Sequence, residues 1–189
     1  MRNKKVDILA FCGVCVALNI VLGIITSAIG IPLYLDTLGT MLTAVIIGPV
    51  PAMIVGALSN IITGLIFNPT DIPFFIVNVA VGLITGLIAK KFSFTLPVAI
   101  VSGLILAAVC PAIGTPIGIA VYGGLNGSWS DVMVAALVEG GKSIFAASFL
   151  RNIASNLVDK VGTSVVTWLL VRLSPGRFLE NFRPENTSK

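Results

Sequence analysis

The stretch EGGKS, Glu139 to Ser143, ends in the Gly-Lys-Ser sequence that closes a nucleotide-binding P-loop. The full motif requires a further glycine, five positions before the glycine that precedes the lysine, on a loop that leaves a strand. Ala136 stands at that position, inside the apolar run VMVAALV, and no strand-like alternation leads into it. The motif is therefore incomplete and predicts no nucleotide site. Lys142 is left to contact some other ligand or to balance Glu139.

Cys12 and Cys15 form a Cys-x-x-Cys pair, a spacing that occurs in redox and metal sites. The chain has no histidine, and both cysteines lie within an apolar run, where they are expected to be small packing residues. The sequence also has no serine elbow and no pair of carboxylates at motif spacing. We therefore expect no catalytic residue, no metal site and no cofactor, and we expect that the chain is not an enzyme.

Polar side chains recur along one face of the last apolar segment. In SFLRNIASNLVDKVGTSVVTW, helical spacing aligns Ser148, Asn152, Ser155, Asn156, Asp159 and Thr163. Polar groups in hydrocarbon are costly, so such a stripe marks either a site or contacts between helices. Both interpretations stay open, and in the second Asp159 pairs with Lys160 or Arg151.

The composition indicates the solvent in which these residues work. Of the 189 residues, 56% are hydrophobic and 11% are charged, and the mean hydropathy is +1.04. Soluble domains carry about 25% charged residues. So little charge cannot cover a globule of this size in water, so the chain is predicted to be a single domain, 1–189, in a lipid bilayer. We expect no nucleic-acid partner.

Prolines, glycines and charges divide the chain into apolar runs that predict an all-α membrane protein, a compact bundle of six transmembrane helices. The expected spans are Ile8–Ile31, Leu35–Gly48, Pro51–Phe67, Ile72–Ala89, Phe94–Tyr122 and a last one that ends near Leu173. The second and third are short, so they are tilted, buried or partly re-entrant. Residues 131–150 are expected to form a surface helix that leads into the last span.

Basic residues gather before the first span, after the fourth and beyond the sixth, as in Lys4, Lys90 and Arg172. An even number of spans places all three groups on one side, which the positive-inside rule assigns to the cytoplasm. Both termini are therefore expected inside (N-in, C-in). Pro111 and Pro116 are expected to interrupt the helical ladder of the fifth span, either around a cavity or as a packing kink.

Small residues at every fourth position favour close packing of helices in lipid. The small residues on the later spans are expected to pack inside the bundle: Gly48, Ala52 and Gly56; Gly82 and Gly86; Gly103 and Ala107. Gly13 and Ala17, on the first span, can equally face another subunit.

Several segments resemble the substrate-binding S components of energy-coupling factor (ECF) vitamin transporters. They are YLDTLGTMLTAVIIGP, NPTDIPFFIVNVAVGLITGLIAKK, GGLNGSWSDVMVAALVEGGKSIFAASFL and LVDKVGTSVVTWLL. The resemblance implies a prokaryotic cell-membrane protein that binds a vitamin or its precursor from outside. It also implies partners, a transmembrane T component and two cytoplasmic ATPases, with which the S component reorients in the membrane to deliver its substrate. Gly13-x-x-x-Ala17 matches the family's docking seam, with glycine in place of the first alanine.

The family's ligand sites draw on the outer loops and on the outer halves of the later helices. The resemblance therefore implies a site built from hydrogen-bonding amides, capping carboxylates, a stacking lid and a cation: Asn78, Asn152, Asn156, Asp36, Asp71, Trp129 and Lys142. The segments are most similar to hydroxymethylpyrimidine, pyridoxine or uncharacterised members, and pantothenate stays open because Lys142 and Arg151 can pair with its carboxylate. Competing hypotheses are a secondary transporter driven by protons through Asp159, and a membrane scaffold or intramembrane enzyme.

Overall fold

The computed structural model describes residues 4–29, 34–125 and 131–182. All regular structure in these ranges is helical, which confirms the all-α part of the predicted fold class. The elements are α1 (Lys4–Ile29), α2 (Leu38–Ile46), α3 (Pro49–Ile66), the 3-10 helix η1 (Pro69–Phe74), α4 (Phe75–Lys91), α5 (Leu96–Tyr122), α6 (Asp131–Glu139), α7 (Ile144–Leu173) and α8 (Gly176–Glu180).

Four helical stretches of the described chain are long and apolar enough to cross a bilayer: Lys4–Ile29, Pro49–Ile66, Pro69–Lys91 and Leu96–Tyr122. The chain is therefore a multi-pass membrane protein. α7 has 30 residues, which is long enough, but its middle carries charge. α2 has only nine residues, which at 1.5 Å per residue spans about half of a hydrocarbon core. The six-span bundle with both termini inside stays a prediction.

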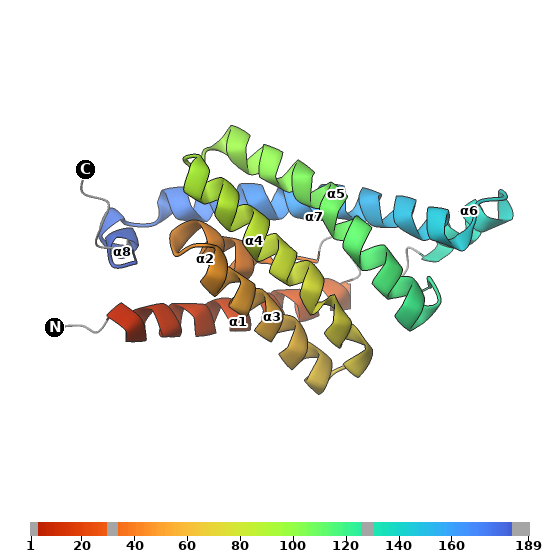
Figure 1. Ribbon diagram of the computed structural model, residues 1–189, viewed down its shortest axis with the longest axis horizontal. Coiled ribbons are helices and arrows are strands. Elements are labelled where there is room, and N and C mark those ends of the chain that lie inside the picture. Colours follow the sequence, from red (N-terminus) through yellow and green to blue (C-terminus); the bar gives the residue numbers. More distant parts are fainter. Residues whose placement is uncertain (1–3, 30–33, 126–130, 183–189) are drawn as a thin grey trace.

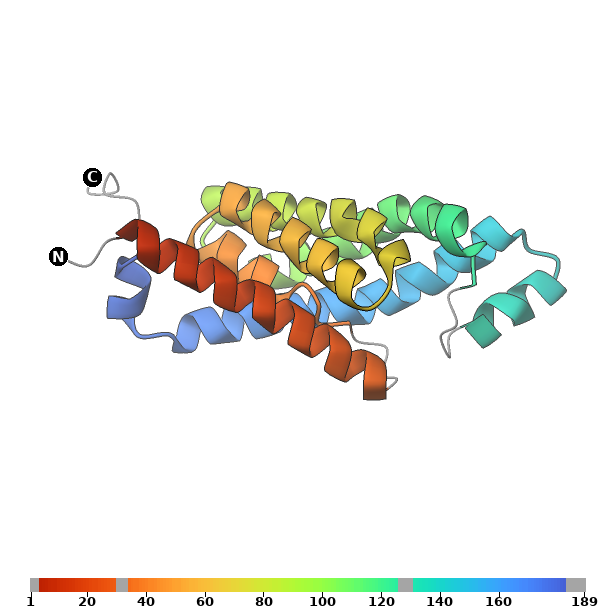
Figure 2. The ribbon, with the colours of Figure 1, turned by 90° about the horizontal axis from the view of Figure 1, so that it is seen from below.

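The elements run back and forth along one long axis, and both ends of the chain lie at the same end of the bundle (Figures 1 and 2). The connection between α4 and α5 lies at that end too (Figure 1). Gly48 lies in the turn between α2 and α3, and a Cβ built on it would be 3.7 Å from the Lys90 Cε. This turn therefore lies at the same end of the bundle. We call this the terminal end, and it gathers the basic residues Lys90 and Arg172.

Small residues set the distance between the helices. A Cβ on Gly86 of α4 would lie 2.5 Å from the Pro49 Cα of α3, and one on Gly103 of α5 would lie 2.6 Å from the Val161 Cα of α7. Real Cβ atoms do not approach so closely, so only glycine allows these backbones to touch. The later small-residue pairs therefore pack inside the bundle, as predicted. A Cβ on Gly13 would meet nothing within 4 Å.

The distribution of side chains is that of a membrane protein. A small apolar cluster of Met41, Val81, Leu106 and Cys110 lies at the centre. Around it the buried positions are rich in serine, threonine and asparagine, while large apolar side chains such as Leu9 lie exposed on the outside. Lipid tails are as apolar as leucine, so this surface needs no other cover, and the polar groups bond to one another across helices.

Two elements differ in detail from expectation. α5 is a single helix of 27 residues that continues through Pro111 and Pro116, so the prolines do not break it. The segment expected as a surface helix over residues 131–150 is instead α6, a turn and the start of α7. The Gly-Lys-Ser sequence lies in that turn, where the Ser143 hydroxyl caps α7 by accepting a hydrogen bond from the Ala146 backbone N–H at 3.2 Å.

Candidate functional site

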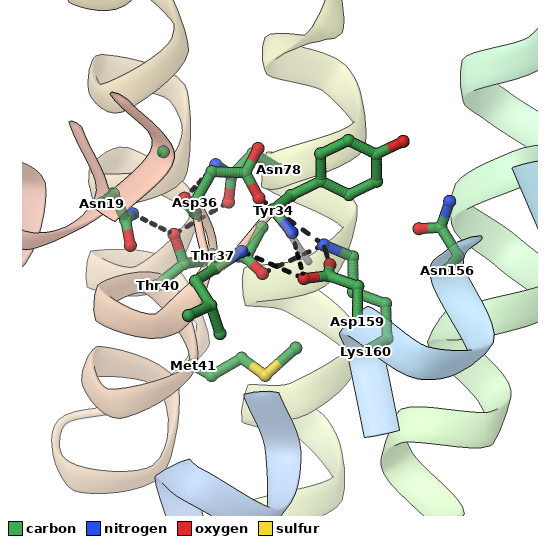
Figure 3. Close-up of polar contacts among 12 residues, drawn as sticks. Asn19, Tyr34, Asp36, Thr37, Thr40, Met41, Asn78, Asn156, Asp159 and Lys160 are labelled. Atoms are coloured by element: carbon green, nitrogen blue, oxygen red, sulfur yellow. Dashed lines mark hydrogen bonds and ion pairs between the residues drawn. The ribbon is translucent and has the colours of Figure 1, made fainter. Parts of the chain in front are cut away.

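The middle of α7 carries an adjacent acid and base, Asp159 and Lys160, both fully enclosed by the bundle (Figure 3). The Asp159 Oδ1 accepts hydrogen bonds from the backbone N–H groups of Tyr34 at 2.8 Å and Leu35 at 3.0 Å. Its Oδ2 lies 2.6 Å from the Lys160 Nζ. A buried charge persists only when it is paired and hydrogen-bonded, and here each charge stabilises the other.

The two α7 residues hold the irregular segment that precedes α2. In this segment Leu35 has φ 48°, a left-handed conformation that is rare for a bulky residue. The Tyr34 carbonyl accepts a bond from the Thr26 Oγ1 of α1 at 2.7 Å, and the Thr37 Oγ1 accepts one from the Lys160 Nζ at 3.1 Å. Non-helical backbone at membrane depth needs such partners. α1 and α7 together therefore fix where Asp36 stands.

Asp36 has bonding capacity that the bundle does not use. Its Oδ1 lies 3.7 Å from the Lys160 Nζ and is buried with no hydrogen-bond partner in the described part of the chain. The side chain as a whole is 43% exposed. One ammonium lies beside two carboxyl groups, and it contacts Asp159 more closely than Asp36. This arrangement suits a ligand that donates an N–H or O–H group.

Tyr34 and Asn156 flank the same group. Tyr34 is exposed, and its ring extends toward the part of α7 that carries Asn156 (Figure 3). The Asn156 Nδ2 donates to the Asn152 carbonyl at 2.9 Å, and its Oδ1 accepts no bond from the residues the structure covers. We define the open edge as Tyr34, Asp36, Asn156 and Lys160. It joins an aromatic face to three groups that form hydrogen bonds.

Asn78, also expected to bind a ligand, has a different place. It is 2% exposed, and its Oδ1 accepts from the Thr40 Oγ1 at 2.8 Å while its Nδ2 donates to the Asn60 Oδ1 at 2.9 Å. The Asn19 Nδ2 continues the chain of bonds by donating to the same Thr40 Oγ1 at 2.9 Å. These residues form the amide network, which joins α1, α2, α3 and α4 and leaves Asn78 little capacity for a ligand.

Asn152 and Arg151 join α7 to its neighbours. The Arg151 Nη1 lies 2.7 Å from the Asp131 Oδ1, and its Nη2 donates to the Asn152 Oδ1 at 3.1 Å. The Asn152 Nδ2 donates to the Thr115 Oγ1 of α5 at 2.9 Å. Arg151 is therefore already committed, and Asn152 is linked to the open edge by its backbone carbonyl, which accepts from the Asn156 Nδ2.

The remaining predicted ligand residues lie apart from this group. Asp71 accepts a hydrogen bond from the Tyr122 hydroxyl, which itself accepts from the Thr70 Oγ1 at 2.7 Å. This arrangement fastens η1 to the end of α5. Lys142 is exposed in the turn before α7. Trp129 lies outside the described residues.

From the sequence, Lys160 is expected only as a partner of Asp159, and the structure shows that pairing. A lysine beside an aspartate in the middle of an apolar helix was itself a signal, because such charges are rare in membrane helices and usually functional.

On α1, Gly13 and Ala17 lie on a face exposed away from the bundle, whereas Cys15 and Asn19 face inward.

Comparison with known proteins gives one result. A family model described as "ECF-type riboflavin transporter, S component" matches residues 3–173, nearly the whole chain. No curated protein and no solved structure matches the chain.

Proposed function

The chain belongs to the family of ECF-type riboflavin transporter S components, and on that premise we propose that it captures a flat heterocyclic vitamin at the open edge. S components are substrate-binding subunits of vitamin-type transporters and are not themselves enzymes. We further propose that it works with a T component and two ATPases and reorients in the membrane to release the substrate inside. ATP hydrolysis then belongs to the partners.

The observation that carries this proposal is the half-exposed carboxyl group of Asp36 beside an exposed aromatic ring. The exposed part of the Asp36 carboxyl can accept an N–H, the Asn156 Oδ1 can accept an O–H, and the Tyr34 ring offers a face for stacking. The single imide N–H, the ribityl hydroxyls and the fused rings of riboflavin, which the family description names, present this combination. Riboflavin is therefore the first candidate.

Hydroxymethylpyrimidine and pyridoxine, favoured by the sequence segments, are smaller flat rings with the same kind of polar edge. Pantothenate fits less well, because its carboxylate would face the carboxyl groups of Asp36 and Asp159, with Lys160 already paired to them. Arg151, one of the two cations considered for it, already pairs with Asp131.

The test is a titration of the purified chain with riboflavin, followed by the quenching of flavin fluorescence, with the other three compounds compared by thermal shift. Asp36→Asn should weaken binding about 10- to 100-fold, since a hydrogen bond to a charged group is worth about 1.5–3 kcal/mol. Asp71→Asn is the matched control and should bind like the wild type. If Asp71→Asn weakened binding and Asp36→Asn did not, the site would be misplaced.

A further inference from the structure

A groove of about 490 Å³ lies at the terminal end of the bundle, away from the open edge. Its walls come from the start of α5 and the last turns of α7, and its lining residues are Phe94, Thr95, Leu96, Trp168, Val171 and Arg172. Phe94, Leu96 and Val171 make most of the lining apolar, and one cation stands beside them. A binding partner must match both parts.

Arg172 is the cation. Its guanidinium carbon lies 5.3 Å from the centroid of the Trp168 ring, a cation–π contact that orients the group while leaving its N–H donors available. No carboxylate of the described residues pairs with it, although α7 carries an acid–base pair elsewhere. Thr95 stands opposite at the start of α5, and its side chain makes no capping bond. Both groups can therefore donate to an anion.

The surroundings indicate which anion. Tryptophan gathers at the boundary between hydrocarbon and headgroups, and Trp168 lies near the end of a long membrane helix. Lys90, Lys91 and Arg177 add positive charge at the same end of the bundle. Next to the groove, Leu96 and Leu173 expose apolar surface that water does not favour but an acyl chain does.

We propose that this groove binds an anionic phospholipid, with the phosphate near Arg172 and Thr95 and an acyl chain along Leu96 and Val171. A soluble phosphate would leave the apolar wall uncovered, and a zwitterionic lipid would bring a second cation to an end that is already basic. The competing occupant is a protein partner of the transporter, and the experiment separates it from the lipid.

The experiment uses Trp168 as the reporter. The chain has two tryptophans, so Trp129→Phe leaves Trp168 alone. This protein is reconstituted into vesicles that contain dibrominated phosphatidylglycerol or, at the same mole fraction, dibrominated phosphatidylcholine, both of which quench nearby tryptophan. The anionic lipid should be preferred about fivefold, the effect of one basic side chain near an anionic surface, and the preference should fall as salt is raised.

Arg172→Gln should abolish the preference, and Arg172→Lys should keep part of it because the charge remains. Arg177→Gln, which removes an equal charge from α8 outside the groove lining, should keep it in full. Equal quenching by the two lipids in the unsubstituted groove would overturn the proposal, and weak quenching by both would overturn it in favour of a protein partner as the occupant. An equal loss in the Arg177→Gln variant would also overturn it, because the preference would then come from the basic end as a whole. Thermal unfolding confirms that each variant is folded.

Discussion

The amide network and the open edge are built from the same kinds of residue and share a neighbour, since Asn78 also donates to the Asp36 carbonyl at 3.4 Å. In the amide network, Asn19, Thr40 and Asn78 each bond to groups on other helices and are buried. At the open edge, Asp36 has an unpartnered oxygen and Tyr34 an exposed ring. The same chemistry therefore serves cohesion in one place and leaves capacity for a ligand in the other.

The two regions differ in how many of their polar groups have hydrogen-bond partners within the fold, and not in residue type. Inside a bundle in lipid, a polar group is stable when its partners are fixed in the fold. A polar group that keeps unused capacity at an exposed edge can bond to a ligand without breaking a contact of the fold. Variants of the two regions should accordingly separate stability from affinity.

The largest effect is expected at Asp159, which supports the open edge. Asp159→Ala removes the acceptor for two backbone N–H groups and the nearest partner of the buried Lys160. Breaking a buried ion pair costs about 3–5 kcal/mol, so the variant should unfold at a markedly lower temperature and lose substrate binding. Thermal unfolding of the purified chain measures this, with Asp71→Ala as the control. Similar losses in both variants would show that Asp159 has no special role.

A smaller effect is expected in the amide network. Asn78→Ala leaves the Thr40 and Asn60 side chains short of a partner, which costs about 1–3 kcal/mol of unfolding free energy. The dissociation constant of the substrate should change less than about twofold, because Asn78 has little capacity left for a ligand. Unfolding and binding are measured on the same preparation. A large loss of affinity at unchanged stability would place Asn78 in the site and remove the contrast between the two regions.

The smallest effect on the isolated chain is expected at Gly13. In Gly13→Leu the new side chain meets open space and replaces glycine, which is a poor helix former. The free energy of unfolding should therefore stay the same or rise by up to about 1 kcal/mol. Substrate binding should also be unchanged. If this face of α1 docks a T component, uptake by the complete transporter should nevertheless stop. Ala17→Leu tests the same seam, and normal uptake in both variants would refute docking there.

The sequence predicted much of the fold because its signals were strong. Long apolar runs predicted α1, α4 and α5, and the spacing of Gly82, Gly86 and Gly103 predicted which small residues allow close packing. The sequence did not show that Pro111 and Pro116 lie inside a continuous helix, because the partners that tolerate a proline in a membrane helix come from tertiary structure. Nor did it show that α2 would be only nine residues long.

The candidate site was less predictable for a related reason. Asn78 on α4 and Asn152 and Asn156 on α7 are the same residue type, and only the assembled bundle shows which of them is fully bonded. In the sequence, Asp36 and Asp71 likewise cannot be told apart, because both are carboxylates in predicted loops. One lies by Lys160 with an unpartnered oxygen, and the other accepts the Tyr122 hydroxyl. Lys160 was not predicted to belong to the site, because the adjacent Asp159 already offered it a structural partner.

The most direct measurement of the central claim is an experimental structure of the chain with riboflavin bound. The account predicts the rings beside Tyr34, with their polar edge within hydrogen-bonding distance of Asp36, Asn156 or Lys160. A flavin bound elsewhere, beside Asp71 and Tyr122 or in the groove at the terminal end, with Asp36 still unpartnered, would contradict it.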